Sequence, residues 1–483
     1  MINIRVIAFV LGILLILEGA FMLISAPISI IYGHPDAIYI VISSSITALA
    51  GFILWFFFRK CSKNIGKREG FIIVSFGWIL FSIFGAIPFV ISGAIPSYTD
   101  AFFETISGFT TTGASILNDV ESLSYGLLFW RSMTQWLGGM GIIVLSLVIL
   151  PILGIGGVQL FTAEVPGPTP DKLHPRIKET AKRLWGVYLI ITSAEVILLI
   201  LGGMPIFDSV CHSFTTMATG GYSIKQASIA YYSSPYIQYV IALFMIIAGI
   251  NFSLSYLALH FKFRRIWNNE EFKAYIGFIA IFTIIITVVL AFTFKKQTLE
   301  KSFRDALFQV VSIITTTGFT TFNYLEWIPS TVILLLILMF FGGSAGSTGG
   351  SIKIVRVLVT LKNGLLELKR LIHPNAIVPV RLDGEAVKPE IVTNVLAFVS
   401  VYIMIWVIGV VVVAFMGYNL ETSLGAVAAT LGNIGPGIGD VGPLYNYSHF
   451  SVFGKWFLSF MMLVGRLELF TVLVLFAPSF WKR

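Results

Sequence analysis

The sequence predicts an all-α polytopic membrane protein with four span–pore-loop–span repeats around a pseudo-fourfold axis and two further N-terminal spans. Three observations predict this class. Apolar segments of about 20 residues recur along the 483-residue chain, and each can cross a hydrocarbon core of about 30 Å. Only 12% of the residues are charged, about half the fraction usual in soluble domains. A glycine-rich polar segment recurs four times between the apolar segments.

Ten spans are expected, which places both termini on the same side of the membrane. The apolar segments are 4–32, 38–58, 71–94, 127–155, 184–203, 236–261, 273–294, 331–341 continuing brokenly to 361, 392–416 and 452–477. They divide the chain into a pair of N-terminal spans and four repeats. The expected units are 1–69, 70–183, 184–272, 273–390 and 391–483.

Basic residues orient these spans. With ten spans, the basic stretches 59–68, 171–183, 262–273 and 362–390 all fall on one face, which the positive-inside rule makes cytoplasmic. Only the stretch 295–304 places lysines and an arginine on the other face. Both termini are therefore expected in the cytoplasm. The net charge of +8 is explained by contact with an anionic membrane surface, so no nucleic-acid partner is expected.

The recurring polar segment can be aligned on one glycine. The four copies are "DAFFETISGFTTTGAS" at 100–115, "DSVCHSFTTMATGGYS" at 208–223, "DALFQVVSIITTTGFT" at 305–320 and "TSLGAVAATLGNIGPG" at 422–437. Three copies begin with an aspartate 13 positions before the glycine, and Thr422 replaces it in the fourth. The aspartates are Asp100, Asp208 and Asp305, and the glycines are Gly113, Gly221, Gly318 and Gly435.

Each copy predicts a short helix that enters the membrane and returns. The initial Asp or Thr is expected to be the N-cap, and about ten further residues are too few to cross the bilayer. Irregular backbone at this depth is tolerated only where it is buried in protein or lines water. Four such loops can meet on one axis, where rings of carbonyl oxygens replace the hydration shell of a cation. A single copy could be an ordinary helix contact, but four copies in register favour a pore.

The motifs "TTTGAS", "TGGYS", "TTTGFT" and "GNIGPGIG" resemble those of the TrkH/KtrB/HKT superfamily of potassium transporters, and the TrkH branch most of all. The resemblance covers essentially the whole chain. It implies potassium-selective uptake across a bacterial inner membrane, with one gated pore in each subunit of a homodimer. The selectivity filter, the only expected metal site, would comprise Thr111, Thr112, Gly113, Thr219, Gly220, Gly221, Thr316, Thr317, Gly318, Asn433, Ile434 and Gly435.

In that superfamily, glycine at the key position of all four loops goes with potassium selectivity, and serine in the first loop goes with sodium permeation. All four positions are glycine here. The fourth loop departs most from the threonine–glycine pattern, because it has Asn433 and Pro436.

A second irregular segment, "FFGGSAGSTGGSIKIVR" at 340–356, interrupts an expected span. Each glycine costs a helix about 1 kcal/mol relative to alanine, so five of them predict a break. The break could serve close packing only, but the resemblance implies a movable gate in this place. The expected gate residues are Gly342, Gly343, Ser344, Ala345, Gly346, Ser347, Thr348, Gly349, Gly350 and Ser351, with Lys353 and Arg356 at the cytoplasmic end.

Charged residues inside spans are expensive and therefore indicate function. Arg466 and Glu468 lie two residues apart in the last span, so they should have different partners. Arg466 is expected to donate to gate-loop carbonyls or to raise a barrier to cations, and a structural pair between helices is the alternative. Glu104 and His212, at equivalent places in two copies, are expected to brace the filter from behind.

The chain lacks a nucleotide-binding motif, a catalytic constellation and zinc-ligand spacing. We therefore expect no enzymatic activity and no cofactor beyond the transported K⁺. The resemblance implies a TrkA-like cytosolic nucleotide-binding ring as regulatory partner, besides the lipid bilayer. Two alternatives stay open: a potassium symporter coupled to H⁺ or Na⁺, and a polytopic membrane enzyme or receptor whose Gly/Thr segments only pack helices.

Overall fold

The structure is a computed structural model that describes residues 2–61, 65–141, 177–294, 297–374, 376 and 378–482. The described part is mostly helical and contains almost no strand, which confirms the all-α class. The strands there are β1 (Arg381–Leu382) and β2 (Glu385–Ala386), which pair antiparallel in a small hairpin.

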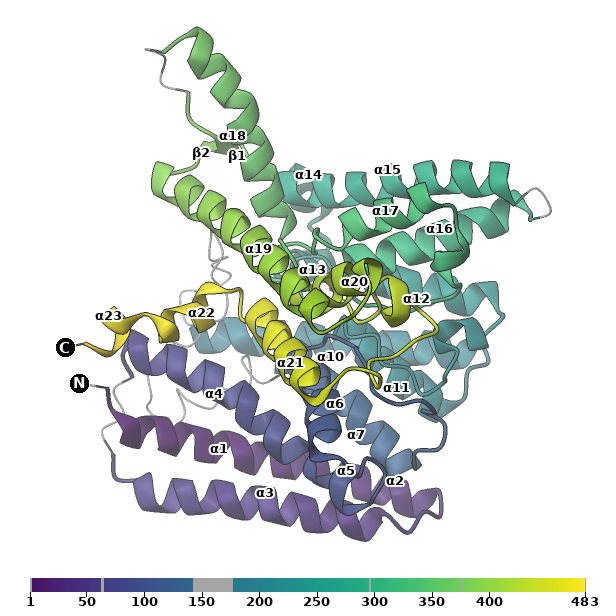
Figure 1. Ribbon diagram of the computed structural model, residues 1–483, viewed down its shortest axis with the longest axis vertical. Helices are drawn as coiled ribbons and strands as arrows, with labels where there is room; N and C mark the ends of the chain where they lie inside the picture. Colours follow the sequence, from purple (N-terminus) through teal and green to yellow (C-terminus); the bar gives the residue numbers. More distant parts are fainter. Residues whose placement is uncertain are drawn as a thin grey trace.

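The N-terminal part contains a tight pair of long helices, α1 (Ile4–Leu23) and α3 (Ala37–Phe58), with the short helix α2 (Ser25–Ile31) between them in the chain. Glycines allow α1 and α3 to approach closely: a Cβ at Gly12 would lie 2.8 Å from the Gly51 carbonyl oxygen, and one at Gly51 would lie 2.6 Å from the Gly12 oxygen. Small residues are the usual means of close helix contact in membranes. The pair lies along one side of the molecule (Figure 1).

The rest of the chain repeats one pattern four times: a long helix, a short helix and a second helix that is broken. The long helices are α4 (Lys67–Gly85) with α5 (Ile87–Ile91), α10 (Ile177–Leu201), α15 (Glu270–Thr293) and α19 (Pro389–Phe415). The short helices are α6 (Tyr98–Phe109), α11 (Ile206–Met217), α16 (Leu299–Ile314) and α20 (Leu420–Leu431).

All four second helices are interrupted, whereas the sequence predicted a break only in the third. The first, α7 (Tyr125–Trp136), passes into a π-helical turn η1 (Leu137–Gly141). The second is α12 (Pro235–Ala248) with α13 (Phe252–Leu259), bent by 112°. The third is α17 (Pro329–Leu338) with α18 (Ile354–Ile372), and the fourth is α21 (Val452–Arg466) with α22 (Phe470–Leu473) and η5 (Val474–Phe476), bent by 111°.

The remaining elements are short and connect these helices. They are η2 (Ser228–Tyr231), α14 (Phe263–Asn268), η3 (Tyr324–Glu326), η4 (Gly439–Val441) and α23 (Pro478–Trp481). The far end of α18 projects away from the body of the protein, and both termini lie at the same end of the molecule (Figure 1).

Six described helices are long and apolar enough to cross a membrane, or up to eight if each strongly bent pair is one span. The expected spans 236–261 and 452–477 are these bent pairs. The part of the expected span 127–155 that follows Gly141 lies outside the described residues. The helices thus form a multi-pass membrane protein, and the total of ten spans stays a prediction.

The expected N-caps of the short helices were wrong. The third helical position, rather than the cap, is occupied by Asp100, Asp208 and Thr422. Asp305 lies further inside its helix, because α16 begins one turn earlier, relative to the aligned glycine, than the other three short helices. The N-cap residues are Ser97, Pro205, Thr298 and Asn419. A carboxylate in the first turn still interacts favourably with the helix dipole, which is why the aspartates resembled caps.

Candidate functional site

The four short helices end in the same backbone turn. In each, the residue two positions before the aligned glycine has a left-handed φ. Its N–H donates to the carbonyl three residues back, and the next N–H donates to the carbonyl five residues back. This pair of bonds is the Schellman motif of helix C-termini. The left-handed residues are Thr111 (φ 51°), Thr219 (φ 53°), Thr316 (φ 58°) and Asn433 (φ 54°).

Three of these turns are strained, because threonine is β-branched and rarely adopts a left-handed φ. Such a conformation costs about 1–2 kcal/mol and persists where the surroundings over-determine it. In the first and third loops, a hydroxyl–hydroxyl hydrogen bond holds the threonine that comes directly before the aligned glycine. The Oγ1 atoms of Thr110 and Thr112 lie 2.8 Å apart, and so do those of Thr315 and Thr317.

The aligned glycines form a closed ring. Each has a positive φ, between 72° and 98°, and each faces the backbone carbonyl that precedes the glycine of a neighbouring loop. The facing pairs are Gly113 with Gly220, Gly221 with Thr317, Gly318 with Ile434, and Gly435 with Thr112. An added Cβ would overlap the carbonyl oxygen in the first three pairs and would lie 2.7 Å from it in the fourth. The structure therefore brings all twelve predicted filter residues together around one axis.

A hollow opens on one side of this ring. All four aligned glycines line it, together with the residues that follow them in each loop. Residues of the loops that return from the short helices, such as Tyr447, also line it. The hollow is therefore a vestibule that leads to the ring from the side opposite to the ends of the short helices.

Side-chain hydrogen bonds, from a neighbouring helix and between the loops themselves, fix the ring. Gln135 Nε2 donates to the Gly220 carbonyl at 2.7 Å, and its Oε1 accepts from the Tyr222 N–H at 3.0 Å. The Asn433 amide donates to Thr112 Oγ1 at 2.9 Å and thereby joins the fourth loop to the first. Asn433, the departure from the threonine pattern, thus serves as a link between loops.

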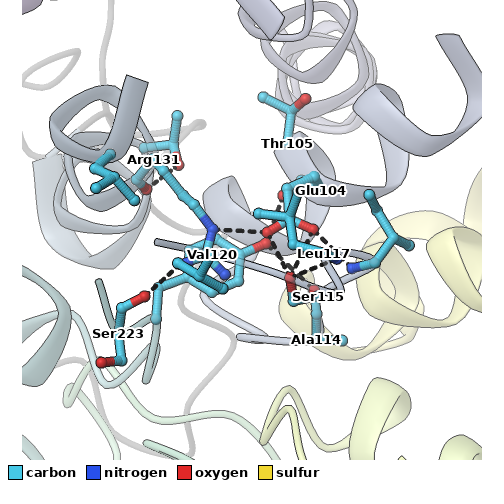
Figure 2. Close-up of polar contacts among 12 residues, drawn as sticks. Glu104, Thr105, Ala114, Ser115, Leu117, Val120, Arg131 and Ser223 are labelled. Carbon is cyan, nitrogen blue, oxygen red and sulfur yellow. Dashed lines mark hydrogen bonds and ion pairs between the residues drawn. The ribbon is translucent and has the colours of Figure 1, made fainter. Parts of the chain in front are cut away.

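Glu104 braces the chain directly behind the first loop (Figure 2). Its carboxylate accepts from Arg131 Nε at 2.7 Å, from Ser115 Oγ at 3.0 Å and from the Ile116 N–H at 2.9 Å. Arg131 also donates to the Ser223 carbonyl at 2.9 Å, so the pair connects the first loop to the second. Both side chains are almost completely buried. This agrees with the expected bracing role of Glu104.

His212 takes the corresponding place in the second loop. Its ring nitrogens contact the Asp208 carbonyl at 2.8 Å and Ser223 Oγ at 3.1 Å. The pair of His212 and Ser223 in the second loop corresponds to the pair of Glu104 and Ser115 in the first. In both loops the first residue lies nine positions before the aligned glycine and the serine lies two positions after it. The two loops therefore share one brace, made with different side chains.

The predicted gate loop lies against the C-terminal ends of the short helices, on the side of the ring away from the vestibule. Thr348 Oγ1 donates to the Met217 carbonyl of α11 at 3.1 Å. The Gly350 N–H donates to Thr316 Oγ1 at 2.7 Å, and Ser351 Oγ donates to the Gly432 carbonyl at 3.2 Å. The loop thus contacts three of the four short helices or the turns that end them.

The loop is also tied to the break in the second repeat. The Ser344 N–H donates to the Gly249 carbonyl at 2.8 Å, and the Phe252 N–H donates to the Gly346 carbonyl at 3.1 Å. Backbone hydrogen bonds therefore connect the break between α12 and α13 to the loop that follows α17.

Arg466 joins the gate loop to the first repeat. It donates to the Thr348 carbonyl at 2.7 Å, to the Gly139 carbonyl at 2.9 Å and to the Gly138 carbonyl. Glu468 has a different partner, because it pairs with Arg356 of α18. Lys353 is buried and donates to the Gly349 carbonyl. Planar guanidinium groups suit such bridging, since they present several donors in a fixed geometry.

Several of these residues were not predicted from the sequence. Arg131 lies in "FWRSMTQW", where a charge inside an apolar segment was a signal for function. The breaks in the other second helices were marked by the glycines of "LGGMG", "IAGIN" and "LVGRL". The contacts of Gln135 and Tyr222 with the ring had no such local signal.

A ring of four equivalent loops between apolar helices, with a vestibule on one side and a glycine-rich loop packed against the other, is typical of a membrane transport protein. Comparison with known proteins identifies the family. Residues 38–483 match TrkH, described as a cation transport protein, and relatives share up to 41% identity over nearly the full length. The chain belongs to the TrkH family.

Three relatives illustrate the likeness. The chain is 41% identical to the Trk system potassium uptake protein TrkH of Salmonella typhimurium, with 99% of each chain covered. It is 34% identical to the Trk system potassium uptake protein TrkG of Escherichia coli, again over 99% of each. The crystal structure of the potassium transporter TrkH from Vibrio parahaemolyticus matches with a TM-score of 0.90 and 37% identity, covering 100% of both chains. These names are of transporters, so the expectation that the chain is not an enzyme is confirmed.

Proposed function

We propose that this protein conducts K⁺ into the cell through a gated pore whose selectivity filter is the ring of four loops. The observation that carries the proposal is the closed ring, in which each aligned glycine faces the preceding carbonyl of a neighbouring loop. Carbonyl oxygens in such a ring can replace the hydration shell of a cation. The three relatives named for potassium support K⁺ as the ion.

The gate loop would close this pore from below. It lies against the ends of α11, α16 and α20, and Arg466 connects it to the first repeat. A loop held at all four repeats occupies the axis below the ring. Since its contacts are individual hydrogen bonds rather than a packed apolar core, the loop can be displaced without unfolding the helices around it.

The proposal extends to the regulation of the pore and to the orientation of the protein in the membrane. The described residues contain no nucleotide fold, so energy or nucleotide sensing would come from a cytosolic TrkA-like ring. The termini and the basic segments would face the cytoplasm, in the inner membrane of a bacterium, with two copies forming a homodimer. The four structural repeats would correspond to 70–183, 184–272, 273–390 and 391–483, after the N-terminal unit 1–69.

Flux into proteoliposomes tests the proposal. The purified protein should take up ⁸⁶Rb⁺ along the K⁺ gradient, and an excess of Na⁺ should compete weakly. Gly113→Ser should lower the preference for K⁺ over Na⁺ by roughly tenfold, equivalent to about 1.4 kcal/mol, because its Cβ would displace the Gly220 carbonyl. Unchanged preference would contradict the filter assignment. Gly93→Ser is the matched control, since Gly93 also has a positive φ (75°) but faces open space.

Proton-coupled symport is a second candidate because of one buried acid. The Glu18 side chain on α1 is 3% exposed, and neither carboxylate oxygen has a hydrogen-bond partner among the described residues. It lies beside Phe109 at the end of α6 and beside Leu137 in the first break. Symport would make Rb⁺ uptake respond to a pH gradient at a fixed K⁺ gradient, and Glu18→Gln would abolish that response. A passive pore would show neither effect.

A further inference from the structure

The fold contains an apolar cavity that the ion pathway does not use. It has a volume of about 400 Å³ and opens between α10, the bend of α12 and α13, the short helix α14, and the start of α15. Its walls are almost entirely apolar, with Ile250 and Leu254 from the bend and Phe263 and Trp267 from α14. An open cavity lined in this way at the surface of a membrane helix bundle suits a hydrocarbon chain.

The rim of the cavity is basic and aromatic. Helix α14 turns Phe263, Ile266 and Trp267 toward the cavity, while Arg264 and Arg265 are exposed beside them. Apolar residues on one face and basic residues on the other are typical of a helix that lies in the membrane interface. Trp267 is 60% exposed, and tryptophan is enriched at that depth. The helix belongs to the basic stretch 262–273, expected on the cytoplasmic side, where anionic lipid headgroups attract arginine and lysine.

We propose that this cavity binds an anionic phospholipid, with an acyl chain inside and the phosphate beside Arg264 and Arg265. The charge of the rim favours an anionic lipid over a zwitterionic one. The apolar walls favour a lipid over a soluble phosphate, which would leave the cavity empty. The occupant is therefore a phospholipid such as phosphatidylglycerol from the cytoplasmic leaflet.

The cavity has a direct structural connection to the gate loop. Ile250 lies in the three-residue break between α12 and α13. The residues on either side of it are bonded to the loop: the Gly249 carbonyl accepts from the Ser344 N–H, and the Phe252 N–H donates to the Gly346 carbonyl. An acyl chain against Ile250 stabilises the bend and therefore the loop position that the bend holds. This second step rests on the proposed function, whereas the binding site itself does not.

Tryptophan quenching tests the site in the full-length protein. Vesicles of phosphatidylcholine are doped with phosphatidylglycerol that carries brominated acyl chains, and the fluorescence lost in the wild type but not in Trp267→Phe reports the cavity. Arg264→Gln with Arg265→Gln should raise the brominated phosphatidylglycerol needed for half-maximal quenching by about tenfold. Ala258→Phe, which fills part of the cavity lining, should lower the quenching without removing any charge.

The matched control is Arg59→Gln with Lys60→Gln, because these basic residues are exposed at the end of α3 and do not line the cavity. That pair should quench like the wild type. Equal quenching by brominated phosphatidylcholine and phosphatidylglycerol would overturn the anionic-lipid assignment. In a third outcome, neither lipid quenches Trp267, and cysteines introduced at the rim of the cavity cross-link two subunits. That result would show that a second copy of the protein covers the cavity instead.

The effect on gating is measured separately by ⁸⁶Rb⁺ flux. Wild-type flux should change severalfold between vesicles with and without phosphatidylglycerol, and the Arg264→Gln/Arg265→Gln variant should not respond. Lipid binding without a flux response would refute the link to the gate and leave the site intact. If the wild type conducted no K⁺ or Rb⁺ in any vesicle, the proposed function would fail while the quenching result would stand.

Discussion

The ring of pore loops and the layer of helix breaks below it are built by opposite rules. In the ring, four different sequences adopt one backbone: the left-handed residue, the Schellman bonds and the positive-φ glycine recur in every copy. In the layer below, the second helices differ from one another: α7 passes into the π-helical turn η1, α12 and α21 are each followed by a short break and a sharp bend, and α17 is followed by a long loop. In the proposed pore, four equivalent loops surround the axis, whereas only the loop after α17 would occupy the axis on the other side of the ring. The asymmetry of the lower layer is therefore a consequence of the symmetry above it.

This comparison predicts that the ring glycines are equally sensitive. Gly113→Ala, Gly221→Ala, Gly318→Ala and Gly435→Ala should each lower ⁸⁶Rb⁺ flux by roughly a hundredfold, because left-handed strain of about 1–2 kcal/mol adds to the overlap with a facing carbonyl. Gly93→Ala should leave the flux nearly unchanged, since its Cβ would meet no neighbour. Normal selective flux in any one of the four ring variants would break the equivalence of the loops.

The buried pair behind the ring should be the next most sensitive. Glu104→Gln would leave Arg131 as a buried charge without its carboxylate partner, which costs about 3–5 kcal/mol. The expected result is a large fall in the midpoint of thermal unfolding in detergent, together with weaker K⁺ selectivity. Glu300→Gln is the control, because the Glu300–Arg304 pair is a partly exposed pair on α16 and such pairs contribute about 0–1 kcal/mol.

The lower layer should control opening rather than selectivity. Arg466→Gln would weaken the bonds from α21 to the Thr348, Gly138 and Gly139 carbonyls. Charge-assisted hydrogen bonds contribute about 1.5–3 kcal/mol, so ⁸⁶Rb⁺ flux through the purified protein alone should rise by about tenfold. The K⁺ over Na⁺ preference should stay constant. A change in preference without a rise in flux would place Arg466 in the filter instead.

The smallest effect is expected for Thr348→Val. It removes one hydroxyl that donates to the carbonyls of Met217 and Ala248, and a neutral hydrogen bond contributes about 0.5–1.5 kcal/mol. Unstimulated flux should therefore rise by roughly threefold. Thr393→Val is the control, since Thr393 donates only within exposed α19. Lower flux in Thr348→Val would mean that the loop supports conduction rather than closure.

Much of this architecture could be predicted because it repeats. Four glycines in register revealed the loops, and the clustered glycines of 342–350 revealed the largest break, since both depend on local backbone propensity. The N-caps were mispredicted for a related reason. An aspartate at the third helical position interacts with the helix dipole much as a cap does, so Asp100 and Asp208 did not by themselves locate the start of the helix.

The sequence by itself determined the membrane class, the four loops and the long break after α17, because hydropathy and glycine content act locally. Only the tertiary structure decided which groups meet: Glu104 with Arg131, Asn433 with Thr112, and Gln135 with Gly220. These partners lie 27, 321 and 85 residues apart along the chain. A buried polar side chain must find a partner, but its own sequence neighbourhood does not specify which one, because that depends on how the four repeats close around their common axis.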